Sequence, residues 1–144
     1  MASDSEKASG PLAGVKVLDF CSFINGSYSA ALMGDLGADI IKVEALYGDL
    51  ARGWGPFIKG ESRPFQTWNR SKRGISLDLR SADGREVVYA LARRADVLVE
   101  NFRPGVTERL GIGYHTLREV NSRIIYCFID GVRSQRSVSR PPGL

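Results

Sequence analysis

The sequence contains few of the residues from which metal centres, disulfide scaffolds and hydrolase sites are built. It has one histidine, His115, and two cysteines, Cys21 and Cys127, which lie far apart and lack the spacing of metal ligands. His115 has no serine, cysteine or acid partner at a recognisable spacing, so we expect neither a catalytic triad nor a metal site. We expect both cysteines to be buried thiols in a reducing compartment.

Long hydrophobic runs are also absent. No apolar segment approaches the roughly 20 residues of a membrane span, and the polar residues 1–10 lack the apolar centre of a signal peptide. These features predict a cytoplasmic protein that has no membrane partner, and a disordered segment over residues 1–10.

An excess of basic charge is confined to one end of the chain. Twenty Lys and Arg against 16 Asp and Glu give a net charge of +4, and three of the cations, Arg133, Arg136 and Arg140, lie in residues 132–144. The remainder is close to neutral, so we expect no nucleic-acid partner.

What the chain does contain is a regular alternation of apolar patterns. Its 144 residues are 43% apolar and 25% charged, which suits one folded domain. Strands are predicted at residues 15–20, 40–44, 75–79, 97–100 and 124–129, and helices at residues 28–36, 83–94, 106–110 and 116–120. Strands that alternate with helices predict an α/β fold with a mostly parallel sheet, which binds ligands at the carboxyl ends of its strands.

Residues 47–71 interrupt this alternation with many glycines, prolines and aromatic residues. We expect a long loop without structure of its own, and loops of this kind are usually functional.

The strand ends lack the common nucleotide-binding motifs. Residues 21–27 follow the first strand without a G-x-G-x-x-G pattern, and the chain has no P-loop. Glu44 stands where a ribose-binding acid would lie in a dinucleotide fold, yet without the glycines an ion-pair or capping role is favoured. We therefore do not expect a nicotinamide cofactor.

Two cationic segments are candidate anion sites. Residues 69–74 carry three cations beside a glycine, which is typical either of a phosphate grip or of a solvated basic turn. Residues 100–105 include Arg103 before a predicted helix start, and Arg109 lies about one helical turn further on. Either a ligand site or a capped turn fits this second segment.

Several ordered blocks resemble the family III CoA-transferases; they are residues 11–19, 34–44, 69–79, 96–105 and 124–127. The resemblance implies that residues 11–131 are the N-terminal part of a Rossmann-like large domain, incomplete here, which in the family belongs to a homodimer. The superfamily also contains α-methylacyl-CoA racemase, but residues 48–56 and the aromatic segment look more like the transferase branch.

The resemblance implies a function as well. Family members transfer CoA between an acyl-CoA and a small carboxylic acid through an aspartyl anhydride, with CoA as a substrate and no tightly bound cofactor. The positions that match the family's CoA-binding residues are Leu77, Asp78, Leu79, Arg80, Asn101, Phe102, Arg103 and Arg109. Ile24 and Ala45 stand where formyl-CoA transferase has glutamine and arginine, which weakens a formyl-type substrate.

The family's nucleophilic aspartate lies beyond the last matching residue, and Asp130 comes one element too early to replace it. We therefore expect a truncated CoA-transferase with no catalytic residue of its own and no activity alone. The alternatives are a fragment of a racemase-like isomerase and a residual CoA-binding module without catalysis.

Residues 132–144 depart from the family phrase that would follow Gly131. With suitable synonymous codons, dropping one base at codon 132 restores that phrase, so we expect an out-of-frame basic tail. The coding DNA tests this expectation directly.

Overall fold

The computed structural model describes residues 9–129. The disordered segment expected at the start of the chain and the out-of-frame tail expected at residues 132–144 lie outside the described residues, apart from Ser9 and Gly10. The elements are, in order, β1 (Lys16–Asp19), α1 (Asn25–Asp35), β2 (Asp39–Glu44), the 3-10 helix η1 (Leu50–Gly53), β3 (Phe57–Ile58), β4 (Glu61–Ser62), α2 (Arg63–Asn69), β5 (Lys72–Ser76), α3 (Ala82–Ala92), β6 (Val97–Glu100), α4 (Val106–Arg109), α5 (Tyr114–Val120) and β7 (Ile125–Phe128).

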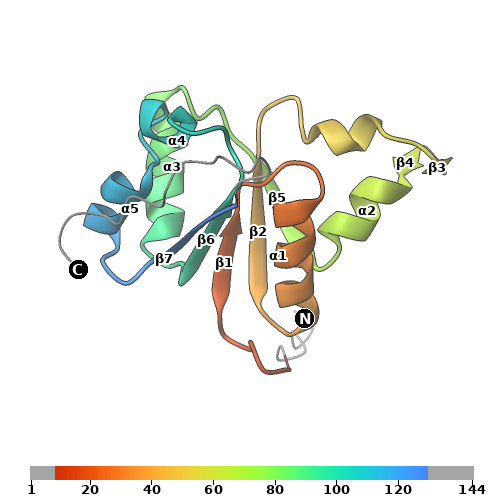
Figure 1. Ribbon diagram of the computed structural model, residues 1–144, viewed down its shortest axis with the longest axis horizontal. Coiled ribbons are helices and arrows are strands. Elements are labelled where there is room, and N and C mark those ends of the chain that lie inside the picture. Colours follow the sequence, from red (N-terminus) through yellow and green to blue (C-terminus); the bar gives the residue numbers. More distant parts are fainter. Residues whose placement is uncertain (1–8, 130–144) are drawn as a thin grey trace, which may run out of the picture.

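Five strands form one parallel sheet in the order β5-β2-β1-β6-β7 (Figure 1). The chain moves from β1 outward to β2 and β5, then returns to pair β6 with the other side of β1. The connections therefore reverse direction between β1 and β6, which is the place where doubly wound sheets form a ligand crevice. The expected α/β fold with a parallel sheet is confirmed.

Helices cover both faces of this sheet. Side chains alternate along each strand, so Val17 and Ile40 pack with Ala30 of α1, whereas Leu18 and Val43 face the opposite way. The second face packs against α3 and α5, as Figure 1 shows. None of the helices between residues 9 and 129 combines the length and apolar composition needed to cross a bilayer.

The third strand lies three residues earlier than the sequence predicts. β5 covers Lys72–Ser76 rather than residues 75–79, because pairing with β2 ends at the Glu44–Ser76 register. Leu77 and Leu79 continue the apolar alternation after pairing has ended, since both pack on the core below as loop residues. The apolar alternation of residues 75–79 therefore indicates burial and not strand pairing.

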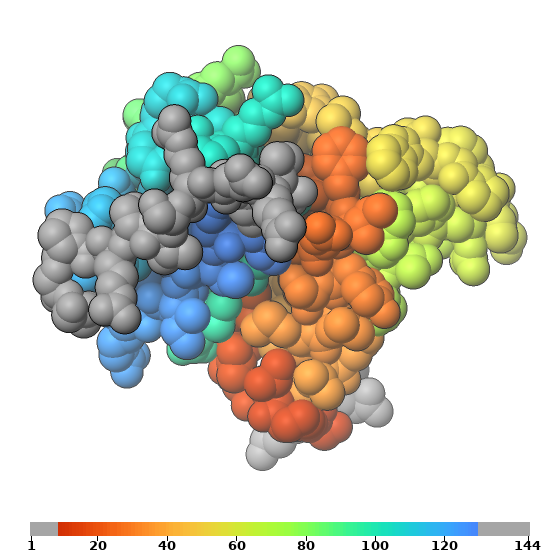
Figure 2. Space-filling view, in the orientation of Figure 1, coloured from red at the N-terminus to blue at the C-terminus, as the bar shows by residue number. Residues whose placement is uncertain are grey.

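The expected long loop without structure is wrong. Residues 47–71 contain η1, the β3–β4 hairpin and α2, which together project from one side of the domain (Figures 1 and 2). The Ser62 hydroxyl accepts the Phe65 N–H and caps α2, whose first turn contains a proline. A capping serine followed by proline is the signal in the sequence that identifies this helix.

The sheet edge at β7 corrects the expectation of two buried thiols. Cys21 is buried beneath α1, but Cys127 is exposed because it lies on the edge strand. Ile125 on the same strand has 62% of its surface exposed, and Phe128 is also exposed. An edge with exposed apolar side chains is open to pairing with another chain.

A network of buried charges ties the first three strands of the chain's sheet together. Lys42 of β2 is 2% exposed, and its Nζ lies 2.9 Å from Asp49 Oδ2 and 3.9 Å from Asp19 Oδ2. Lys72 Nζ of β5 lies 2.7 Å from the same Asp19 oxygen. Lys42 Nζ also donates to the Cys21 carbonyl oxygen at 2.6 Å, just before α1. Two lysines and two aspartates thus compensate one another in the interior.

We predict that Lys42→Met destabilises the fold by about 3–5 kcal/mol, because Asp49 would keep a buried charge without its cation. The matched control is Arg73→Met, which removes the exposed ion pair between Arg73 and Asp39 at a cost of about 0–1 kcal/mol. Chemical denaturation of both variants measures the difference. Equal losses in the two variants would contradict a special role for the buried network.

Candidate functional site

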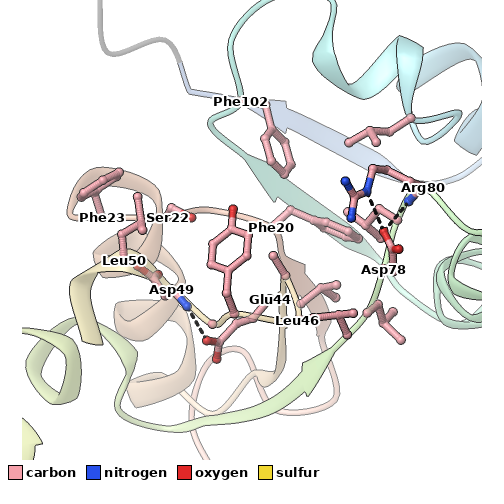
Figure 3. A pocket seen from close by; sticks show the side chains of 17 residues that line it. Phe20, Ser22, Phe23, Glu44, Leu46, Asp49, Leu50, Asp78, Arg80 and Phe102 are labelled. Atoms are coloured by element: carbon pink, nitrogen blue, oxygen red, sulfur yellow. Dashed lines mark hydrogen bonds and ion pairs between the residues drawn. The ribbon is translucent and has the colours of Figure 1, made fainter. Parts of the chain in front are cut away.

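A pocket of about 390 Å³ opens at the carboxyl ends of four neighbouring strands, β5, β2, β1 and β6 (Figure 3). Every lining segment lies at the end of one of these strands or directly after it, except for Leu110, which follows α4. The lining residues are Phe20, Ser22, Phe23, residues 43–50, residues 77–80, Phe102 and Leu110. This is the edge at which a parallel sheet is expected to bind its ligand.

The walls of the pocket are mainly apolar. Phe20 continues the buried face of β1, and Leu77 and Leu79 are partly buried residues after β5 that pack against the same core. Phe102 and Leu110 are half-buried against the same core, and Figure 3 shows the Phe102 ring on the opposite side of the pocket from Glu44. Aromatic and aliphatic walls of this kind suit the flat apolar face of a ligand.

Glu44 contributes a carboxylate to the pocket but uses it internally. Its Oε1 and Oε2 accept hydrogen bonds from Arg52 at 2.6 and 2.8 Å, and Oε2 also accepts the Asp49 N–H at 2.8 Å. Burial opposes ionisation of Glu44, yet these hydrogen bonds outweigh burial and hold the pKa of Glu44 below its ordinary value. The ion-pair role favoured by the sequence is confirmed.

Asp78 and Arg80 form the polar rim. Arg80 Nε lies 3.1 Å from Asp78 Oδ1, and hydrogen bonding by Arg80 holds the pKa of Asp78 below its ordinary value. The Arg80 side chain is 83% exposed, so this pair contributes little to stability. The guanidinium is therefore available to a phosphate or carboxylate at the mouth of the pocket.

The pocket brings together five of the eight sequence-predicted site residues, Leu77, Asp78, Leu79, Arg80 and Phe102. The other three, Asn101, Arg103 and Arg109, do not line it. Asn101 bridges the reversal point of the sheet instead, because its Oδ1 accepts the Ser22 N–H at 3.0 Å and its Nδ2 donates to the Ser22 carbonyl at 2.7 Å. Arg103 and Arg109 are exposed beside the start and end of α4.

The three cations of the basic segment at residues 69–74 are paired with carboxylates of the chain itself. Arg70 pairs with Asp35, Lys72 with Asp19, and Arg73 with Asp39. All three cations neutralise carboxylates of β1, α1 or β2, so the segment joins β5 to its neighbours.

Glu100 is the most deeply buried acid at the β6 end, with 3% of its surface exposed. Its Oε2 accepts the Phe102 N–H at 2.7 Å and its Oε1 accepts the Tyr126 hydroxyl at 3.2 Å. Burial, with a smaller contribution from Glu108, raises the pKa of Glu100 despite these bonds. Burial likewise raises the pKa of Tyr126 above its ordinary value.

Sequence reasoning missed the wall that residues 43–50 and Phe20 contribute. The sequence indicates Glu44 only as an ion-pair, capping or ribose-binding residue, and it assigns no role to Asp49. The signal for Asp49 is its place as an N-cap, since its Oδ1 accepts the Ala51 N–H at 2.9 Å. Within residues 9–129, no group of three or more His, Cys, Asp or Glu side chains is placed to hold a metal ion.

We predict that Glu100→Gln stabilises the fold at neutral pH. A raised pKa means that ionised Glu100 costs folding energy, so its stabilising contribution is present below the unfolded pKa and is lost as the pH rises through the folded pKa. Glutamine does not titrate, so the variant should melt above the wild type at about pH 8 and converge with it near about pH 4. Thermal melts of both proteins across this pH range test the prediction. A difference in melting temperature that does not change with pH would contradict the titration of Glu100.

Comparison with known proteins places this geometry in a family. The model for "CoA-transferase family III" matches residues 12–144. The chain is 40% identical over 126 residues to acetyl-CoA:oxalate CoA-transferase of Acetobacter aceti, covering 87% of this chain and 32% of that protein. It is 38% identical over 135 residues to human succinyl-CoA:glutarate CoA-transferase, covering 92% of this chain and 31% of the relative.

A solved structure agrees with the sequence relatives. The crystal structure of a CAIB/BAIF family protein from Brucella suis superposes with a TM-score of 0.79 at 40% identity, over 83% of this chain and 33% of that one. The chain thus spans about a third of the length of the relatives that it matches. From the match of the family model over most of its residues, we conclude that the chain belongs to CoA-transferase family III.

Proposed function

We propose that this chain forms the CoA-binding edge of an acyl-CoA:carboxylate CoA-transferase. The observation that carries the proposal is the meeting of residues 77–80 with Phe102 in one pocket. These two segments are separate in the sequence, and the family resemblance assigns both to CoA. They meet at the edge of the sheet where ligands of doubly wound folds are held.

The chemistry of the pocket fits parts of CoA. CoA carries an adenine ring and several phosphates, and the pocket offers the aromatic faces of Phe20 and Phe102 beside the guanidinium of Arg80. Its volume of about 390 Å³ suits a ring system, and the rest of the molecule then extends across the surface. Arg103, shortly before α4, and Arg109, at its end, are exposed, and we propose that they meet that extended part.

The second substrate is a small carboxylic acid. The relatives differ in this acid, since one is named for oxalate and another for glutarate, so we propose the class and not a single compound. These relatives carry CoA-transferase names, which favours transfer over the racemase alternative. The exposed apolar edge at β7 supports association of the full-length protein, for which the family resemblance suggests a homodimer.

The nucleophile of the transfer lies outside this chain in our proposal. A carboxylate that attacks a thioester needs an unengaged oxygen directed at the thioester carbon. The two buried acids that line the pocket are engaged already, Glu44 with Arg52 and Asp49 with Lys42, and Asp78 lies at the exposed rim, where its Oδ1 is paired with Arg80. The chain therefore supplies binding and positioning, and the reacting aspartate would come from the longer protein.

We predict saturable binding of CoA to the chain in titration calorimetry. Arg80→Ala, Arg103→Ala and Arg109→Ala should each weaken binding by about tenfold, the loss that corresponds to one charge-assisted hydrogen bond. Arg123→Ala is the matched control, because Arg123 is exposed in the turn before β7. This turn lies at the amino end of the strand, whereas the pocket lies at the carboxyl ends of the strands. The absence of saturable binding would overturn the proposed function. An equal loss of affinity in Arg123→Ala would show that CoA binds through the overall positive charge of the chain and not at this site.

We predict no CoA transfer when the chain alone is incubated with succinyl-CoA and a panel of carboxylic acids. The physical reason is that each acid at the pocket is held by a cation. Mass-spectrometric detection of new acyl-CoA products measures the exchange. Turnover that survives rigorous purification would place a nucleophile within these 144 residues and contradict the proposed division of roles.

A further inference from the structure

A carboxylate stands at the carboxyl end of each of the four strands that surround the pocket, or, for Asp78, two residues beyond it. Each of these side chains accepts a backbone N–H from the loop that follows its own strand. Asp19 accepts from Cys21 at 2.9 Å, and Glu44 accepts from Asp49 at 2.8 Å. Asp78 accepts from Arg80 at 3.1 Å, and Glu100 accepts from Phe102 at 2.7 Å.

The repeated arrangement has a simple physical cause. Where a strand leaves the sheet, the next backbone N–H groups lose their ladder partners and require another acceptor. A carboxylate near the strand end can bond one of these N–H groups, two residues further on for Asp19, Asp78 and Glu100 and five for Glu44. The bond fixes the direction in which the loop departs. The loops held in this way contribute Ser22, Asp49, Arg80 and Phe102 to the pocket.

Negative charge at this edge would repel an anionic ligand unless it were compensated. Three of the four carboxylates have a cation: Lys42 and Lys72 flank Asp19, Arg52 pairs with Glu44, and Arg80 pairs with Asp78. Glu100 differs, because within residues 9–129 no lysine or arginine forms an ion pair with it. Its partners there are the Phe102 N–H and the Tyr126 hydroxyl.

We infer that Glu100 is a positioning residue, whose carboxylate holds the segment after β6 so that the Phe102 ring forms a wall of the pocket. The inference rests on the proposed function for the identity of the ligand. Two successive residues of the segment are held. The Asn101 side chain is bonded to the Ser22 backbone, and the Phe102 N–H donates to Glu100. A buried acid without a cation is expensive to keep, which is consistent with a role that an apolar residue cannot fill.

Amide hydrogen exchange of the full chain, followed by NMR, tests the inference without any ligand. In Glu100→Met, which fills similar space and accepts no hydrogen bond, the Phe102 amide should exchange at least about tenfold faster, the factor expected for one bond to a charged acceptor. Glu100→Gln keeps an acceptor oxygen and should retain most of the protection. Unchanged exchange in Glu100→Met, with its other amides folded as in the wild type, would overturn the inference.

Glu108→Gln is the matched control. Glu108 is exposed on α4 and contributes to the charge around Glu100, but it accepts no backbone N–H among the hydrogen bonds of residues 9–129. Its removal should leave the Phe102 amide protected. If the Phe102 amide lost as much protection in Glu108→Gln as in Glu100→Met, the effect would come from local charge. That result would overturn the positioning role of Glu100.

CoA titrations separate this inference from the proposed function. If the wild type binds CoA, Glu100→Met should weaken binding by about tenfold, whereas Glu100→Gln should keep most of the wild-type affinity. Wild-type affinity in Glu100→Met would overturn the inference while the proposed function stands. If the wild type does not bind CoA, the proposed function fails, and the amide measurement alone decides whether Glu100 holds the loop.

Discussion

The buried ammonium group of Lys42 is the constraint on which the rest of the structure depends. A charge at 2% exposure requires carboxylates close by, and Asp19 and Asp49 meet that requirement from β1 and from the segment before η1. Asp19 in turn receives Lys72 of β5. One electrostatic requirement therefore joins three strands of the sheet and fixes where the chain runs after β2.

The same requirement shapes the pocket. Because Asp49 is drawn to Lys42, residues 45–50 turn back over the sheet, and Glu44 secures the turn with bonds from Arg52 and the Asp49 N–H. The turn forms one wall, and the segments after β5 and β6 form the others. The pocket is thus a consequence of how strand ends satisfy their backbone donors, and its apolar lining comes from core residues that continue beyond the strands.

This arrangement gives physical content to membership of CoA-transferase family III. The part of the family fold that the chain covers is the part in which parallel strands end side by side, and such an edge can hold a ligand before any reacting group is added. In the proposed function, binding and bond making are then separable properties of the longer protein. Engaged carboxylates around the pocket suit binding, because they are already neutralised and do not repel an anionic ligand.

Outside residues 47–71, local patterns in the sequence determined the order of strands and helices, the parallel sheet and the strand β6 at residues 97–100, because burial repeats with the period of each element. They misplaced β5, since the alternation through Leu77 and Leu79 reflects core contact after pairing ends. Which side chains face one another was decided by the tertiary structure: the sequence leaves Lys72 either in a phosphate grip or in a solvated turn, and the fold pairs it with Asp19. A contact between residues that are far apart in the sequence produces no periodic pattern, so it becomes visible only when the sheet is assembled.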